Sequence, residues 1–100
     1  MMQLHWTPEA IQDREAIYDY IQADNPIAAL ALDELFEEKA GRLVDYPGLG
    51  RPGRVVGTRE LVAHQNYVLV YDVTSDLVRM LRVLHAARKW PSDDRAGRSH

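Results

Sequence analysis

The stretch that decides the fold is residues 57–91, which reads GTRELVAHQNYVLVYDVTSDLVRMLRVLHAARKWP. It contains three apolar segments, residues 60–64, 67–73 and 77–85, separated by the short polar links Gln65-Asn66 and Thr74-Ser75-Asp76. Such links are typical of turns between strands. They favour antiparallel neighbours, because a parallel return needs a crossover of about a dozen residues. The sequence therefore predicts an antiparallel sheet in the second half of the chain.

A loop and one further strand candidate precede this stretch. Residues 47–53 include two prolines and three glycines, which is typical of a stiff loop. From Arg54 the pattern of apolar residues changes from helical to strand-like, so Arg54-Val55-Val56 is predicted to form a strand that ends at a Gly57-Thr58 turn.

The first half of the chain has the pattern of a short strand followed by two helices. Leu4-His5-Trp6 is a β-like start, and Thr7-Pro8 provides an N-cap and a proline at the first helical position of a helix that runs to about Ala23. Asn25-Pro26 repeats that signal, and Tyr46-Pro47-Gly48 ends the second helix. We expect an α+β fold in which both helices cover one face of the sheet.

Composition narrows the class of protein. The chain has 100 residues, 46% of them hydrophobic and 27% charged, which is ordinary for a soluble globular domain. The sequence has no cysteine, and no apolar run approaches the ~18 residues that a membrane helix needs. No secretory signal is visible at the N-terminus. We expect one domain over residues 1–91, a flexible tail over residues 92–100, a cytoplasmic location and no contact with membranes.

Charge is distributed unevenly along the chain. Residues 1–50 carry three basic side chains against ten carboxylates, whereas residues 51–100 carry nine against five. A basic half can attract nucleic acid or an acidic partner. The net charge of −3 argues against avid phosphate binding, because nonspecific affinity grows with the number of phosphates that are neutralised. The alternative is that the asymmetry only reflects acidic helices and strands that end in arginine.

The order of these elements and several short motifs resemble the RelE/ParE superfamily of small bacterial toxins. In the first half the resemblance is carried by Trp6-Thr7-Pro8, by Ala10, Asp13, Ile17, Tyr20 and Ile21, and by Asn25-Pro26 followed by Ala28-Ala29. In the second half it is carried by Gly50-Arg51, Gly57-Thr58-Arg59-Glu60-Leu61, Tyr67-x-Leu-Val-Tyr71 and the run from Arg82 to Pro91. The resemblance implies a RelE/ParE-like fold with the order β-α-α-β-β-β(-β), in which two N-terminal helices pack on one face of a mainly antiparallel sheet. Arg14 stands where family members usually place leucine.

The resemblance also implies a function and a set of partners. Such proteins are toxins of type II toxin-antitoxin systems, which serve plasmid stabilisation, and a cognate antitoxin neutralises them. ParE-like members inhibit DNA gyrase, whereas RelE-like members cut messenger RNA on the ribosome. Operator DNA would be met only through the antitoxin. A third alternative is a non-toxic homologue that only binds its antitoxin.

A metal-independent ribonuclease needs a group that deprotonates the ribose 2′-hydroxyl, cations that stabilise the phosphate and an acid for the leaving oxygen. The candidates for these roles are Arg54, Arg59, Arg82 and His85. The RelE-type set is incomplete, because Val68 stands where those enzymes carry arginine and the terminal tyrosine has no counterpart near Trp90-Pro91. The resemblance therefore favours the ParE branch, a binding inhibitor without catalytic activity.

Six residues are candidates for contact with a target or partner: Arg59, His64, Arg82, Arg88, Lys89 and Trp90. Each also has a structural interpretation. Arg82 can form an ion pair with Glu60 or Asp72, on a strand face shared with Met80 and Leu84. Tyr67 and Tyr71 are expected to pack in the core with their hydroxyls at its rim. No cofactor and no metal site are expected.

Overall fold

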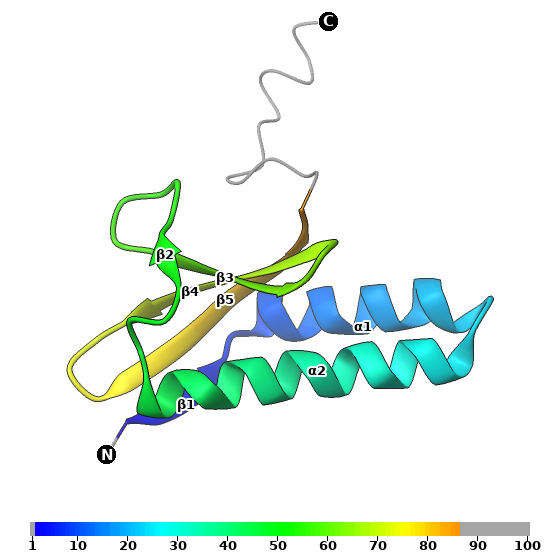
Figure 1. The fold of residues 1–100 in the computed structure, drawn as a ribbon, viewed down its shortest axis with the longest axis horizontal. Coiled ribbons are helices and arrows are strands. Elements are labelled where there is room, and N and C mark those ends of the chain that lie inside the picture. Colours follow the sequence, from blue (N-terminus) through cyan, green and yellow to red (C-terminus); the bar gives the residue numbers. More distant parts are fainter. Residues whose placement is uncertain (1, 87–100) are drawn as a thin grey trace, which may run out of the picture.

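The computed structural model describes residues 2–86, and Figure 1 shows their arrangement. The elements are β1 (Gln3–Trp6), α1 (Pro8–Gln22), α2 (Pro26–Asp45), β2 (Arg51–Pro52), β3 (Arg59–His64), β4 (Tyr67–Val73) and β5 (Leu77–His85). The expected α+β class and the expected order of helices and strands are confirmed. Arg88, Lys89, Trp90 and the predicted tail over residues 92–100 lie outside the described residues.

Both helices begin at the residues that the sequence indicates. The Thr7 hydroxyl accepts a hydrogen bond from the Ala10 amide at 3.2 Å, and the Asn25 side chain accepts one from the Ala28 amide at 3.0 Å. Each bond satisfies an amide that the first turn of a helix leaves without a backbone partner. A proline follows each cap, and its fixed φ suits the first helical turn.

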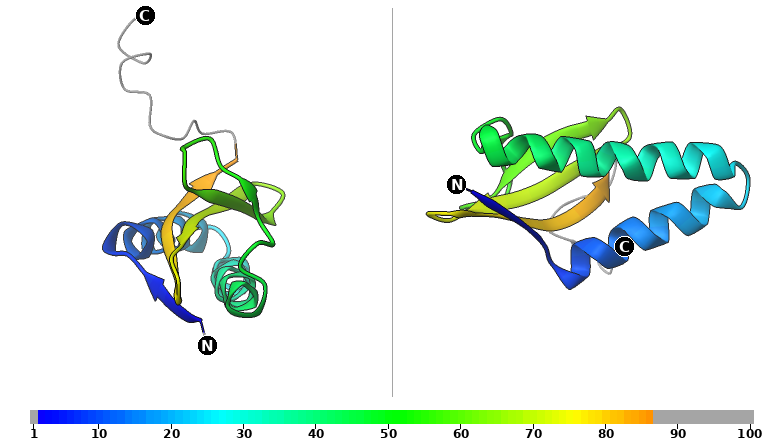
Figure 2. Two further views of the ribbon diagram at one scale, coloured as in Figure 1. Left: turned by 90° about the vertical axis from the view of Figure 1, so that its left-hand side faces the viewer. Right: turned by 90° about the horizontal axis from the view of Figure 1, so that it is seen from below.

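The sheet has five strands in the order β1-β5-β4-β3-β2. The second half of the chain forms the predicted antiparallel sheet, because β2, β3, β4 and β5 pair antiparallel in sequence order. β1 adds to the far edge, parallel to β5, and α1 and α2 form part of the long connection that such pairing requires. The two views of Figure 2 show both helices on one side of this sheet.

A bulge changes the phase of β5 near its middle. Val70 pairs with Arg82 and Tyr71 with Met80, so Leu81 is an extra residue. Val78 and Met80 therefore reach the main core before the bulge, and Val83 reaches it after the bulge. The expectation that Arg82 shares a face with both Met80 and Leu84 is wrong, because it assumed unbroken alternation along the strand.

The main core lies between the helices and the sheet. Its largest fully buried side chains include Phe36 and Leu43 from α2, Leu69 and Tyr71 from β4, and Met80 from β5. The expected core packing of Tyr71 is confirmed, with its exposed fraction at 0%. Burial of such side chains contributes roughly 1.5–3 kcal/mol each, so this layer is the main source of stability.

The predicted strand at Arg54-Val55-Val56 is wrong. The strand that pairs with β3 is the two-residue β2, and residues 55–58 form a turn in which the Thr58 amide donates to the Val55 carbonyl at 3.0 Å. Gly57 supplies the positive φ of this turn, at 87°. Val56 is left 99% exposed. The apolar, β-branched residues Val55 and Val56 favour a strand, but Gly57, which follows them, adopts the positive φ of a turn.

Among residues 2–86, no helix is both long enough and apolar enough to cross a membrane.

Candidate functional site

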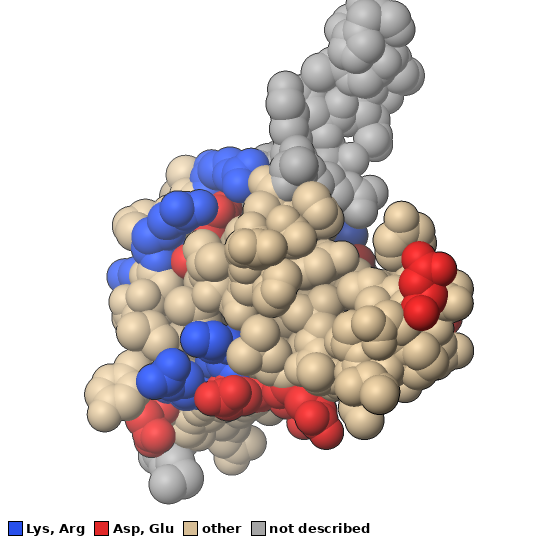
Figure 3. Space-filling model, turned by 45° about the vertical axis from the view of Figure 1, so that its right-hand side comes forward, with Lys and Arg blue, Asp and Glu red and all other residues tan. Residues whose placement is uncertain are grey.

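A groove of about 910 Å³ lies between the helical hairpin and one end of the sheet. Its floor and walls are mostly apolar or small side chains from α1 and α2. The face that comes forward in Figure 3 is uncharged over most of its middle, with charged side chains gathered toward its edges. The lining residues are Asp13, Ala16, Ile17, Tyr20, Ile21, Ala28, Ala31, Leu32, Leu35, His64, Asn66, Tyr67, Val83 and His85.

The groove exists because the helices extend beyond the sheet (Figure 1). On α2, Phe36, Ala40 and Leu43 are buried against the sheet, whereas Ala31 and Leu35, toward the tip of the hairpin, line the groove. Ala31 and Leu35 thus extend the apolar surface of α2 beyond the part that packs against the described sheet. An apolar groove of this kind is suited to the apolar face of a helix.

Aromatic and imidazole rings from three strand ends form the sheet side of the groove. His64 pairs with Tyr67 across the β3–β4 hairpin, and Tyr67 pairs with His85 of β5. The Tyr67 ring centroid lies 6.3 Å from that of His64 and 5.3 Å from that of His85. The expected core packing of Tyr67 holds in part, because it meets Phe36 edge to face at 5.7 Å and also lines the groove. The sequence places both histidines at strand ends, but their convergence on Tyr67 depends on the strand register.

Arg82 is held beside this groove by a carboxylate of α1. Its Nε and Nη2 donate to Asp13 at 2.7 and 3.1 Å, and the Val83 amide donates to the same carboxylate at 2.9 Å. The hydrogen bonds to Asp13 raise the pKa of Arg82 above its ordinary value, against the opposing effect of burial. An ion pair of Arg82 was expected, but the expected partners, Glu60 and Asp72, are wrong. Glu60 instead pairs with Arg51 and Arg54, and Asp72 pairs with Arg79.

The other two arginine candidates lie at the β2–β3 side of the sheet, away from the lining of the groove. Arg59 donates from Nη1 to the Gly50 carbonyl at 2.6 Å. Arg54 places Nε 3.6 Å from Oε2 of the buried Glu60, and its amide donates to the same oxygen at 3.1 Å. The structure therefore brings His64 and His85 together at one end of the sheet. Arg82 pairs with Val70 farther along the strands and is held by Asp13, and Arg54 and Arg59 do not join the two histidines.

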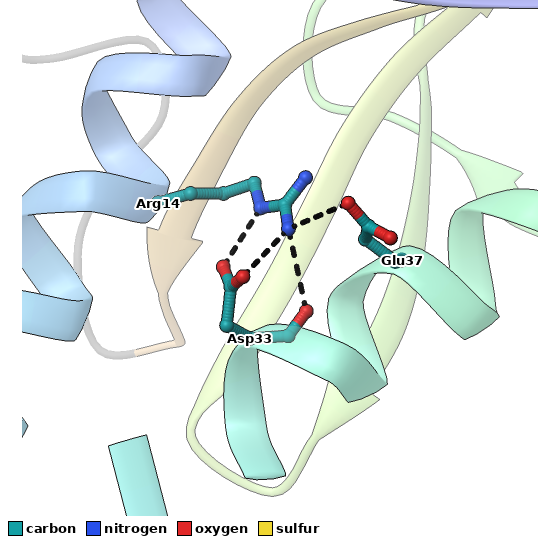
Figure 4. Close-up of polar contacts among 3 residues, drawn as sticks. All are labelled: Arg14, Asp33 and Glu37. Atoms are coloured by element: carbon teal, nitrogen blue, oxygen red, sulfur yellow. Dashed lines mark hydrogen bonds and ion pairs between the residues drawn. The ribbon is translucent and has the colours of Figure 1, made fainter. Parts of the chain in front are cut away.

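Arg14 joins the two helices on the side away from the groove. It donates from Nε and Nη2 to the two carboxylate oxygens of Asp33 at 2.9 and 2.8 Å, and from Nη2 to Glu37 at 3.1 Å (Figure 4). Its guanidinium carbon lies 4.5 Å from the centre of the Trp6 ring. Burial opposes the charge, but Asp33 and Glu37 outweigh it and raise the pKa of Arg14. Arg14, which stands where family members usually place leucine, thus finds its carboxylate partners on the other helix.

Within residues 2–86, no three histidine, cysteine, aspartate or glutamate side chains gather in a way that could hold a metal ion. What the groove offers chemically is an apolar surface with two imidazoles, two phenols, one carboxamide and one engaged carboxylate.

Comparison with known proteins places this architecture among toxins. Residues 4–90 match the family model described as the ParE toxin of the type II toxin-antitoxin system parDE. The chain is 40% identical over 88 residues to the toxin RelE2 of Caulobacter vibrioides, a match that covers 88% of this chain and 99% of the relative. It is 38% identical over 89 residues to Y4kP of Sinorhizobium fredii, covering 88% of this chain and 92% of that protein.

Solved structures agree with the fold. A chain of the chromosomal ParDE toxin-antitoxin system from Pseudomonas aeruginosa superposes with a TM-score of 0.76 at 31% identity, over 85% of this chain and 96% of that one. The YoeB/ParE toxin from Agrobacterium tumefaciens shares the fold with a TM-score of 0.60 at 18% identity, over 84% of this chain and 98% of that one. The protein thus has the architecture of the RelE/ParE superfamily of toxins. Within that superfamily it belongs to the ParE toxin family of type II toxin-antitoxin systems.

Proposed function

We propose that this toxin acts by binding DNA gyrase and poisoning it, and that a cognate antitoxin holds it inactive by filling the groove. The observation that carries the proposal is the distribution of positive charge. The lining of the groove contains two histidines but no lysine and no arginine among the described residues. Phosphoryl chemistry on RNA requires several cations around one phosphate, together with groups that transfer protons.

The arginines that are candidates for catalysis each contact another group of the protein. Arg82 pairs with Asp13, Arg54 with the buried Glu60, and Arg59 with the Gly50 carbonyl. None of these three arginines lines the groove with His64 and His85, so the described residues do not gather several cations around one phosphate beside these rings. These contacts support a toxin that works through a binding surface.

The groove supports the antitoxin part of the proposal. Ala16 and Ala31 are exposed on its walls, and Leu32 and Leu35 are half-buried. An amphipathic helix of the antitoxin would cover these side chains and gain the apolar burial that the chain by itself does not provide. The structural relative from Pseudomonas aeruginosa comes from a ParDE toxin-antitoxin system, which fits a partner of this kind.

The first test is a supercoiling assay with purified gyrase and the toxin freed of its antitoxin. We expect inhibition of supercoiling together with accumulation of cleaved DNA. Far-ultraviolet circular dichroism establishes in parallel that the toxin is folded. A folded toxin that leaves gyrase unimpeded at micromolar concentration would refute gyrase as the target.

A second candidate function is a ribosome-dependent ribonuclease, and one observation favours it. His64, Tyr67 and His85 converge at one end of the sheet, and such rings can transfer protons. The close relative from Caulobacter vibrioides also carries the name RelE2. In a translation reaction programmed with a defined messenger RNA, this function would produce new 5′ ends that His85→Ala removes. Absence of cleavage by the folded toxin would exclude it.

A separate experiment tests whether the antitoxin binds in the groove. Ala31→Glu places a charge on the exposed wall of the groove, so we expect it to weaken antitoxin binding without unfolding the toxin. Leu30→Glu is the matched control, because Leu30 is 51% exposed on the same helix and does not line the groove. Equal antitoxin affinity of both variants in calorimetry would show that the antitoxin binds elsewhere.

A further inference from the structure

The segment from Pro47 to Thr58 forms a loop that is rigidly held and yet exposes an apolar tip. In Figure 1 it leaves the C-terminal end of α2 and rises past β2 to the side of the sheet away from the two helices. Its tip residue, Val56, is 99% exposed. Single exposed apolar residues are common on protein surfaces, so exposure alone indicates nothing. What distinguishes this valine is the number of contacts that hold the loop around it.

The base of the loop is fixed to the sheet by a tyrosine and an arginine. The buried Tyr71 hydroxyl accepts from the Gly50 amide at 2.9 Å and donates to the Pro47 carbonyl at 2.8 Å. Arg59 donates to the Gly50 carbonyl. A Cβ atom at Gly50 would lie 2.7 Å from the Tyr71 hydroxyl and 2.8 Å from the Glu60 carbonyl oxygen, so no larger residue fits there without movement.

The upper part of the loop is held by further hydrogen bonds. The Gly53 amide donates to the Thr58 carbonyl at 2.7 Å, and the Thr58 hydroxyl donates to the Val55 carbonyl at 2.7 Å. The Arg54 amide donates to the carboxylate of Glu60. A loop fixed in this way loses little conformational entropy when a partner binds it.

The same loop carries two exposed guanidinium groups. Arg51 and Arg54 each lie 3.6 Å from an oxygen of Glu60, whose side chain is only 2% exposed, while their own side chains are 62% and 47% exposed. One buried carboxylate is thus shared by the guanidinium groups of both arginines and compensates only part of their charge. Their outer surfaces still face solvent, and positive charge exceeds negative charge within residues 51–60.

We propose that residues 51–57, the Val56 loop, are the surface through which this toxin engages its target, and that the loop binds an acidic protein surface with an apolar pocket for Val56. The proposal rests on the proposed function, a toxin that poisons a protein, and adds the surface that does so. The fully exposed valine favours a protein over a nucleic-acid backbone, because phosphates and sugars offer an apolar tip nothing to bury against. The Val56 loop shares no residue with the lining of the groove, so target and antitoxin would use different surfaces.

The test compares Val56→Asp with a matched control, Ile27→Asp. Both residues are apolar, β-branched and exposed, Ile27 at 83%, and neither change removes a buried contact. Ile27 lies in the first turn of α2, where a carboxylate is well tolerated. Circular dichroism and thermal unfolding of both variants verify the fold.

We expect Val56→Asp to lose at least about tenfold in gyrase inhibition, which corresponds to about 1.4 kcal/mol of binding free energy. We expect Ile27→Asp to inhibit like the wild type, and both variants to bind the antitoxin unchanged. Gyrase inhibition by Val56→Asp equal to that of the wild type would overturn the assignment of the loop.

Growth arrest in cells that express each variant separates the two proposals. If the wild-type toxin arrests growth without inhibiting gyrase, the gyrase proposal fails and the loop is judged by growth arrest alone. Val56→Asp should then still be less toxic than Ile27→Asp. Equal toxicity of the two variants would refute the loop as the target surface, whatever the target is.

Discussion

Replacing Asp13 by alanine tests how the helical hairpin is attached to the sheet. The Asp13 carboxylate accepts from Arg82 Nε and Nη2 and from the Val83 amide. It therefore joins α1 to the part of β5 that extends past its last pairing with β1, at Met80. Asp13→Ala removes all three acceptor contacts at once and changes no core side chain.

The expected loss of stability has two parts. A backbone amide that is left without an acceptor costs roughly 1–3 kcal/mol, and Val83 is only 2% exposed, so water cannot readily replace the carboxylate. The Arg82 side chain is 27% exposed and can be rehydrated, so the lost ion pair adds only about 0.5–1 kcal/mol. The two parts add to about 1.5–4 kcal/mol, which would lower the Tm by roughly 6–30 °C in a domain of this size.

Urea unfolding followed by circular dichroism measures this loss. Asp13→Asn keeps an oxygen acceptor for the Val83 amide but loses the charge. We therefore expect it to destabilise the protein by about half as much as Asp13→Ala does. Asp19→Ala, an exposed change on the same helix, should lie within about 0.5 kcal/mol of the wild type. If Asp13→Ala also lies within that range, the carboxylate does not attach α1 to β5 in the way described.

Two further changes test contacts elsewhere in the fold. Arg14→Leu removes the pairing with Asp33 and the contact with Trp6, so we expect a loss of stability of about 1–2 kcal/mol that becomes smaller in about 1 M salt. Urea unfolding at low and high salt measures this loss. A loss that does not depend on salt would contradict its ionic origin. Tyr71→Phe removes the two hydrogen bonds of the phenol and should cost about 1–2 kcal/mol near neutral pH. Burial raises the pKa of Tyr71, so the unfolded chain releases this proton first and the wild type should lose stability as pH rises above about 10. Unfolding of the phenylalanine variant between about pH 8 and 11 should show a shallower decline, and equal slopes would exclude this origin.

The sequence predicts this fold well where the signals are local. The caps at Thr7 and Asn25 act within one helical turn, so their residue types alone indicate where each helix begins. The short links Gln65-Asn66 and Thr74-Ser75-Asp76 likewise determine antiparallel neighbours. Each of these features depends on residues that are close together in the chain.

The failures come from contacts between distant residues. The partner of Arg82 is Asp13, 69 positions away, and the bulge at Leu81 that accompanies this contact has no local signal. The convergence of His64 and His85 on Tyr67 is likewise a product of strand register. For these reasons the sequence points to His64 and His85 at strand ends, but it does not identify the helix residues that line the groove with them.

The bulge in β5 also affects how the protein avoids unwanted self-association. An exposed strand edge can recruit a strand from another molecule, which leads to aggregation. β1 covers β5 only as far as Met80, and beyond it the Val83 amide is occupied by a carboxylate of α1. The Asp13 side chain of α1 thus occupies a backbone donor of β5 where pairing with β1 ends, so that another strand cannot bind it there. At the opposite edge, β2 pairs with β3 only at Arg59 and Glu60, which leaves the outer side of residues 61–64 as the part of the described sheet most open to strand addition.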